Sequence, residues 1–162
     1  MAKVTNSPSF PRSAVADVRL SLEAFDPASE IASFNARHPD AGGIVTFLGQ
    51  VRDSGGVEAL ELQHYEPMTL PGMQELARVT EKRWPVEGLL ILHRSGVMYP
   101  GDAIVLVCAA ARHRRDAFAA ADFAMDHLKS ESWFWKREKT AAGWRWIEPR
   151  PEDHEDISRW RI

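Results

Sequence analysis

Hydrophobic and polar residues alternate in short runs along most of the chain, which is the pattern of half-buried strands. Residues 17–24 (DVRLSLEA), 42–52 (GGIVTFLGQVR) and 57–65 (VEALELQHY) all read this way. The second and third runs are joined by Asp-Ser-Gly-Gly, a composition typical of a tight hairpin turn. We therefore expect three strands here, the last two paired as a hairpin.

Helical periodicity appears in three other segments. Asp26 and Pro27 can cap and start a helix that runs to about Arg37, and a second helix is expected after Pro71, ending before Trp84-Pro85. The longest spans about 114–130. Its apolar residues at helical spacing predict a buried stripe made of Phe118, Ala121, Met125 and Leu128.

The remaining runs are again strand-like. Residues 89–97 and 103–111 flank the turn Tyr-Pro-Gly-Asp, and a final hairpin is expected on either side of Ala-Ala-Gly at 141–143. Strands and helices mix without regular βαβ alternation, so we predict the α+β class, with a mixed, largely antiparallel sheet and packed helices. One domain is expected over 17–150, between a flexible N-terminal tail (1–16) and a C-terminal tail (151–162).

Composition excludes several kinds of site. The chain has 162 residues, 44% of them hydrophobic, and a single cysteine, Cys108, in an apolar run where a buried, inert thiol is expected. One cysteine permits no disulfide framework, and six scattered histidines give no metal-ligand spacing. There is no nucleotide-binding glycine motif, no secretory signal and no membrane-spanning run. We expect a cytoplasmic protein without metal or cofactor.

Positive charge is local, since the net charge is −3. The clusters RHRR (112–115) and KREK (136–139) hold six of the twenty Lys and Arg residues. Cations at the start of a helix are unfavourable unless an anion compensates them. These clusters favour a small anion pocket over a nucleic-acid surface, although a solvated basic face remains the alternative.

Two lysines flank a group of aromatic residues. Strand alternation places Phe134 and Lys136 on one face of the last hairpin, and Lys129 ends the preceding helix. A lysine held beside apolar surface can act as a nucleophile or general base. The alternative is that both lysines lay their stems over aromatic rings and keep their amines in water.

Segments in a fixed order resemble the catalytic large subunit of molybdopterin synthase. They are GGIVTFLGQVR, LELQHYEPMT, RWP, HRSGVMYPGD, HRRDAFAAADFAMDHLKSESWFWKRE and GWRWIE. The resemblance covers residues 40–150 and is most specific from YPGD to FWKRE, which combines a turn, a strand, a helix and both lysines. It implies an α/β-hammerhead-like fold.

The resemblance also implies an activity. Enzymes of this family transfer sulfur from the C-terminal thiocarboxylate of a small ubiquitin-like sulfur-carrier subunit, which ends in Gly-Gly, to cyclic pyranopterin monophosphate. The product is the dithiolene of molybdopterin, in molybdenum cofactor biosynthesis. The large subunits are expected to form a homodimer within a heterotetramer, with no nucleic acid or membrane as partner.

The family's functional positions fall on eight residues of this sequence. The resemblance assigns catalysis to Lys129 and Lys136. It assigns substrate binding to the side chains of Arg52, His113, Arg114, Arg137, Glu138 and Arg150. Arg150 resembles an arginine that reaches the pocket of a neighbouring protomer.

The sequence departs from the family pattern at two places. Gln50 stands where a lysine is common, and the turn DSGG is shorter than the usual loop. Two other functions stay open. Tryptophans interleaved with cations could stack the bases of a single-stranded nucleic acid, or the chain could be a scaffold that binds a ubiquitin-like tail without chemistry.

Overall fold

Two four-stranded sheets form the framework of the chain, of which the computed structural model describes residues 15–130 and 133–161. Sheet A consists, in spatial order, of β1 (Ala16–Ser21), β4 (Val86–Arg94), β6 (Ala103–Ala111) and β2 (Gly43–Gln50). Sheet B consists of β5 (Gly96–Met98), β3 (Ala59–His64), β7 (Phe134–Thr140) and β8 (Gly143–Ile147). β1 runs parallel to β4, and the other pairs in the described part are antiparallel. The expected α+β class with a mixed sheet is confirmed.

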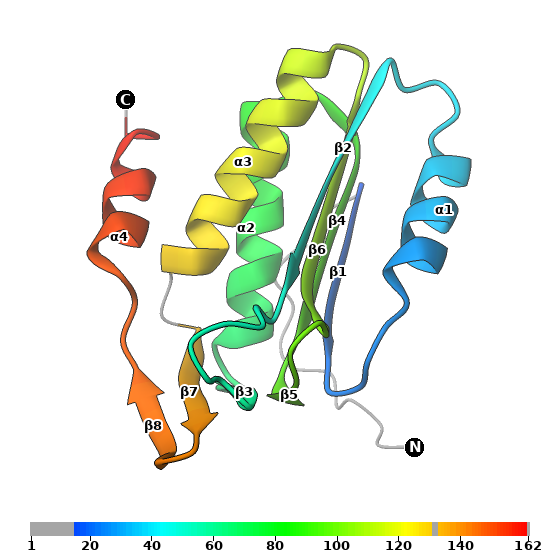
Figure 1. Ribbon diagram of the computed structural model, residues 1–162. Helices are drawn as coiled ribbons and strands as arrows, with labels where there is room; N and C mark the ends of the chain where they lie inside the picture. Colours follow the sequence, from blue (N-terminus) through cyan, green and yellow to red (C-terminus); the bar gives the residue numbers. More distant parts are fainter. Residues whose placement is uncertain (1–14, 131–132, 162) are drawn as a thin grey trace.

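Helices cover both faces of sheet A (Figure 1). One face is covered by α1 (Pro27–Arg37), the other by α2 (Thr69–Arg83) and α3 (Arg114–Ser130), with α4 (Pro151–Ser158) outside α3. Because successive strand residues point to opposite faces, β4 supplies both cores. Leu89 and Ile91 pack toward α2 and α3, while Leu90 and Leu92 pack toward α1. None of the described helices is long and apolar enough to cross a membrane.

The first helix forms as its sequence predicts. Asp26 accepts a hydrogen bond from the backbone N–H of Ala28 at 3.1 Å, and Pro27 occupies the first turn. Phe34 then lies fully buried against the α1 face of sheet A, beside Cys108. Burial also raises the pKa of the Cys108 thiol, in keeping with the inert role expected for it.

The prediction that β2 and β3 pair as a hairpin is wrong, because the two strands belong to different sheets. β2 pairs with β6 in sheet A, whereas β3 pairs with β5 and β7 in sheet B. The glycine turn is present, and Gly55 and Gly56 both adopt the left-handed backbone that glycine permits, with φ of 65° and 71°. This turn carries the chain from one sheet to the other, because long hydrophobic strands elsewhere supply better partners for each run.

The strand expected over 89–97 is interrupted at Ser95. β4 ends at Arg94, and β5 starts at Gly96, whose φ of 100° redirects the chain into sheet B. The Ser95 hydroxyl donates to the backbone oxygen of Leu62 in β3 at 2.9 Å. At Ser95, sheets A and B are therefore joined both by the continuous backbone from β4 to β5 and by a buried hydrogen bond.

The buried stripe of α3 is confirmed at Ala121, Met125 and Leu128, but Phe118 is 61% exposed. The helix instead buries Ala117 among its small residues. These allow α3 to lie close to the sheet and turn the Phe118 ring outward. Periodicity identified the helix, but it did not identify which of two neighbouring stripes faces the sheet.

The C-terminal segment, expected to be a tail, forms α4 and packs against α3. Trp160 lies edge-on to Trp84 and Phe123, and its indole N–H donates to Asp126 at 2.6 Å. The Arg159 guanidinium also binds Asp126, at 2.6 Å. Trp160 and Arg159, just after α4, thus anchor the last helix to α3.

Burial of His93 predicts that acid destabilises the protein. Desolvation lowers the pKa of His93 to about 4 from an ordinary 6.5. Between these pH values the unfolded chain binds a proton that the folded chain does not, so the free energy of unfolding should fall by about 3 kcal/mol on acidification. In urea titrations at several pH values, His93→Gln should reduce the dependence of the unfolding free energy on pH. His154→Gln, an exposed control, should keep the native dependence. Equal slopes in all three proteins would contradict this assignment.

Candidate functional site

The last turn of α3 and the middle of β7 present two amines at one end of the molecule. Lys129 lies one residue before the end of α3, and Lys136 is the third residue of β7. Both side chains are exposed. Leu62 and Ile147 lie opposite Lys136 on the neighbouring strands, so the amine rises from the middle of sheet B and not from its edge.

The strand carrying Lys136 is anchored by an aromatic stack. The Phe134 ring lies 4.2 Å from the His93 ring, nearly parallel to it, and packs into the core. The His93 Nδ1 is hydrogen-bonded to the Arg94 carbonyl at 2.8 Å. Lys136 follows Phe134 by two residues and shares its face. The proximity of Lys136 to packed aromatic surface stays a prediction, supported by this alternation.

Arg137 points to the opposite face of sheet B. Its guanidinium binds Glu61 at 2.5 Å and lies over the rings of Trp144 and Trp146, at 4.4 Å and 5.5 Å. Glu138 returns to the face of Lys136. Adjacent residues of a strand cannot serve the same pocket, so Arg137 holds β3 and β8 to β7 while its two neighbours face the other way.

Arg52 is positioned by the turn between β5 and β6. Val51 is buried, its N–H donates to the Asp102 carbonyl at 2.9 Å, and its own carbonyl accepts from Gly101 at 2.8 Å. The Asp102 carboxylate accepts the N–H of Tyr99 at 2.9 Å and closes the turn. The exposed Arg52 therefore projects from a fixed backbone directly after β2.

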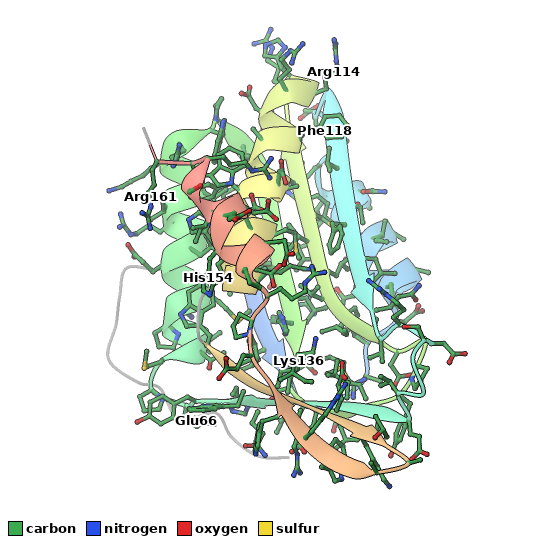
Figure 2. The ribbon with its side chains drawn as sticks, turned by 60° about the vertical axis from the view of Figure 1, so that its left-hand side comes forward. Glu66, Arg114, Phe118, Lys136, His154 and Arg161 are labelled. Carbon is green, nitrogen blue, oxygen red and sulfur yellow. The ribbon has the colours of Figure 1, made fainter. Side chains whose placement is uncertain are left out.

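His113 and Arg114 lie at the far end of α3. Arg114 and Lys129 are separated by about 22 Å along the helix axis, given 1.5 Å per residue. Figure 2 shows Arg114 and Phe118 together at one end of the molecule and Lys136 well away from them, above the strands of sheet B. The single cleft expected from the sequence is therefore not assembled within one chain.

Arg150 lies at the start of α4, near the lysine end of α3, where the Ser130 hydroxyl donates to the backbone oxygen of Asp153. It is the N-cap residue, and its exposed guanidinium lies 3.5 Å from Asp153 of the same helix. An ion pair this exposed adds little stability. The side chain is therefore free to exchange Asp153 for another anion.

Sequence reasoning passed over the glycine pair that positions the basic cluster. A Cβ on Gly42 would lie 2.0 Å from the carbonyl oxygen of Arg112, and one on Gly43 would lie 3.3 Å from the Cα of Arg114. Only glycine permits the approach at position 42, whereas a Cβ at position 43 would require a shift of a few tenths of an ångström. The start of β2 therefore packs closely against the start of α3. The sequence signal for this close packing is the Gly-Gly pair itself, at the start of the run 42–52.

The described residues hold no group of three or more His, Cys, Asp or Glu side chains that could bind a metal ion. The predicted site residues offer amines, guanidinium groups, the imidazole of His113 and the carboxylate of Glu138. Such a set binds phosphate and carboxylate and can move protons or form a bond to a carbonyl carbon.

Comparison with known proteins gives a consistent result. The family model described as "MoaE protein" matches residues 20–131. The molybdopterin synthase catalytic subunit of Ralstonia nicotianae is 42% identical over 148 residues, covering 90% of this chain and 84% of that protein.

Solved structures agree with the sequence matches. The MoaE protein from Burkholderia ambifaria superimposes with a TM-score of 0.77 at 41% identity, covering 91% of this chain and 99% of that one. A complex of subunits 1 and 2 of the molybdopterin-converting factor from Helicobacter pylori gives a TM-score of 0.72 at 16% identity, over 82% of this chain and 91% of that chain. At that identity the likeness shows the fold alone.

The contact between Arg137 and Glu61 predicts a measurable pKa change. A hydrogen bond from Gln63 lowers the pKa of the Glu61 carboxyl group below its usual range, and Arg137 lowers it further. Arg137→Gln should therefore raise the pKa of Glu61, as measured by carbon-detected NMR titration. Lys139→Gln, an exposed change on the same strand, should leave it unaltered. If the pKa of Glu61 is the same in the Arg137→Gln variant as in the native protein, the ion pair between the two side chains does not form in solution.

Proposed function

The chain belongs to the MoaE family, the molybdopterin synthase catalytic subunits, and on this basis we propose how its residues perform the reaction. The substrates are a small ubiquitin-like subunit with a C-terminal Gly-Gly thiocarboxylate and cyclic pyranopterin monophosphate. Sulfur passes from the first to the second, and two transfers make the dithiolene. The cytoplasmic location expected from the sequence stays a prediction.

The observation that carries this proposal is the placement of two exposed amines at one end of α3. Lys129 either adds to the thiocarboxylate carbonyl carbon, so that the C–S bond breaks, the sulfide passes to the pterin and water later frees the tail as a carboxylate, or it activates that carbonyl or moves a proton during sulfur addition. Lys136 balances the negative charge of the tail or substrate. Glu138, on the face of Lys136, orients the incoming groups. Arg137 supports this site from the opposite face by fixing the strand.

Binding of the phosphate and pterin requires the cations at both ends of α3. Arg52 lies two residues after the end of β2. Its planar guanidinium can form paired hydrogen bonds with phosphate. His113 and Arg114 are too far along α3 to join Lys129 in the same chain. We propose that the neighbouring protomer of a homodimer supplies these two residues, and that Arg150 also reaches across to the partner's pocket.

The exposed ring of Phe118 supports this assembly. It is 61% exposed and lies beside Arg114 at the same end of the molecule (Figure 2). An aromatic ring next to a cationic group is the composition favoured at the centre of protein interfaces. A two-fold contact in which the two α3 helices lie side by side and antiparallel, with Phe118 in the contact, would bring the cations of one protomer to the lysine end of the partner's helix.

A second candidate is a single-stranded nucleic-acid-binding surface on the outer face of sheet B. Trp135 and Trp146 are 65% and 57% exposed, and Arg137 lies among the tryptophan rings. Bases could stack there, although the net charge of −3 opposes binding of a polyanion. A salt-sensitive gel shift with single-stranded RNA, lost in Trp135→Ala, would favour this candidate.

Loss of the Lys129 amine should remove most turnover. Lys129→Ala is expected to lower the rate of dithiolene formation by about 10²–10⁴-fold, the usual contribution of a proton-transfer group. The assay mixes the variant with thiocarboxylated small subunit and cyclic pyranopterin monophosphate. Lys139→Ala is the matched control and should keep full activity. A Lys129→Ala protein with the unaltered rate would exclude this lysine, and binding of the tail without any product from the native chain would indicate a scaffold.

Sharing of the site between protomers predicts complementation. Arg114→Ala and Lys129→Ala proteins should each be inactive, but mixing and re-associating them should restore about a quarter of native activity. Half of the re-formed dimers are mixed, and each mixed dimer keeps one intact site. Activity that stays at the level of the separate variants would show that both residues act within the same chain.

A further inference from the structure

Arg94 is a charged side chain buried at the end of β4 without an adequate partner. The residue is 7% exposed, and its Nε is buried without a hydrogen-bond partner in the described part of the chain. The carboxylate of Asp102 lies 3.8 Å from its Nη1, which is too long for a hydrogen bond. A guanidinium stays charged at every physiological pH, so its burial is costly unless something accepts its N–H groups.

Asp102 is not positioned to be that acceptor. Its Oδ2, the atom nearest to Arg94, already accepts the backbone N–H of Tyr99 at 2.9 Å and closes the turn before β6. The Asp102 side chain is also 41% exposed, against 9% for Arg94. The carboxylate therefore holds the turn and faces water, and the buried donor of Arg94 remains unpaired.

A cavity of about 230 Å³ lies against Arg94. It is lined by the start of the α1 region and by the ends of β2 and β6, with contributions from Ala24, Phe25, Leu48, Gln50, Arg94 and Asp102. Cavities for drug-sized ligands range over roughly 300–1,000 Å³. This one fits a smaller group, and its walls are apolar except for Arg94, Gln50 and Asp102.

The cavity is separate from the amines of the proposed catalytic site. Phe25 packs with the core cluster on the α1 face of sheet A. Arg94 continues the alternation of Leu90 and Leu92, which face the same way. Lys129 belongs to α3, on the opposite face. A ligand held by Arg94 therefore does not occupy the space beside Lys129 of the same chain.

We propose that this cavity binds a small oxyanion, either a phosphate or a carboxylate group, with Arg94 as its principal donor. Arg94 lines the cavity, and the terminal nitrogens of its planar guanidinium can donate to the oxygens of the anion. Gln50 lies at the rim, and its exposed amide supplies a further N–H donor. Gln50 is also the position where the sequence departs from the lysine common in its family, so residue 50 is the place to test the charge at the rim.

Titration of Arg94 by NMR tests the proposal. Protein labelled with ¹⁵N is titrated with sodium phosphate, and separately with sodium acetate, against sodium chloride at equal ionic strength. The Arg94 Nε–H signal, assigned with Arg94→Lys, should shift and saturate with one or both oxyanions and not with chloride. Saturation by phosphate alone identifies a phosphate site, and saturation by acetate identifies a carboxylate site. Either result supports the proposal.

Substitutions of Gln50, at the rim of the cavity, provide a second test that leaves the buried Arg94 intact. Gln50→Glu places a carboxylate beside Arg94 and should weaken oxyanion binding by about tenfold or more, whereas Gln50→Lys should tighten it by about tenfold. Gln74→Glu and Gln74→Lys, the same changes on α2, should have no effect. An Arg94 signal that does not saturate with either oxyanion, or affinities that ignore residue 50, would overturn the proposal and indicate a cavity filled by water.

Discussion

The rigid length of α3 is the constraint on which the account of this protein depends. A hydrogen-bonded helix of 17 residues is about 25 Å long and does not bend enough to bring its ends together. The basic cluster is fixed at its start, where Gly42 and Gly43 pack against the backbone of 112–114. Lys129 is fixed at its end, and Lys136 lies on β7, the next strand along the chain. A chain built in this way cannot bring both groups to the proposed catalytic site alone, and in our proposal a second copy supplies the missing group.

Sheet B gives the lysine end its shape. β7 is held on one face by the stack of Phe134 on His93 and on the other by the contact of Arg137 with Glu61. The amine of Lys136 is thus exposed while its strand is anchored on both sides. The junction at Ser95 attaches this sheet to the core that supports α3. Both amines therefore rest on parts of one continuous framework.

Local signals were sufficient for the helices and for most strand positions, because capping residues and periodicity act within a few neighbours. Asp26 and Pro27 fixed the start of α1 from the sequence. Pairing was not predictable in the same way: the turn at Gly55-Gly56 is a good hairpin sequence, yet partners far along the chain outcompete it. The exposure of Phe118 and the docking of Trp160 also depend on surfaces that form only after folding. The functional residues were assigned by resemblance, and their separation by α3 required the structure.

The most direct test of the central claim is a crosslinking measurement between protomers. A chain with His113→Cys is mixed with a chain carrying Lys129→Cys, and a bifunctional maleimide much shorter than α3 is added. The native Cys108 is fully buried and should not react. Our account predicts a covalent dimer in the mixture and no internal crosslink in a chain that carries both substitutions. An internal crosslink in the monomeric double variant, or no crosslinked dimer in the mixture, would contradict it.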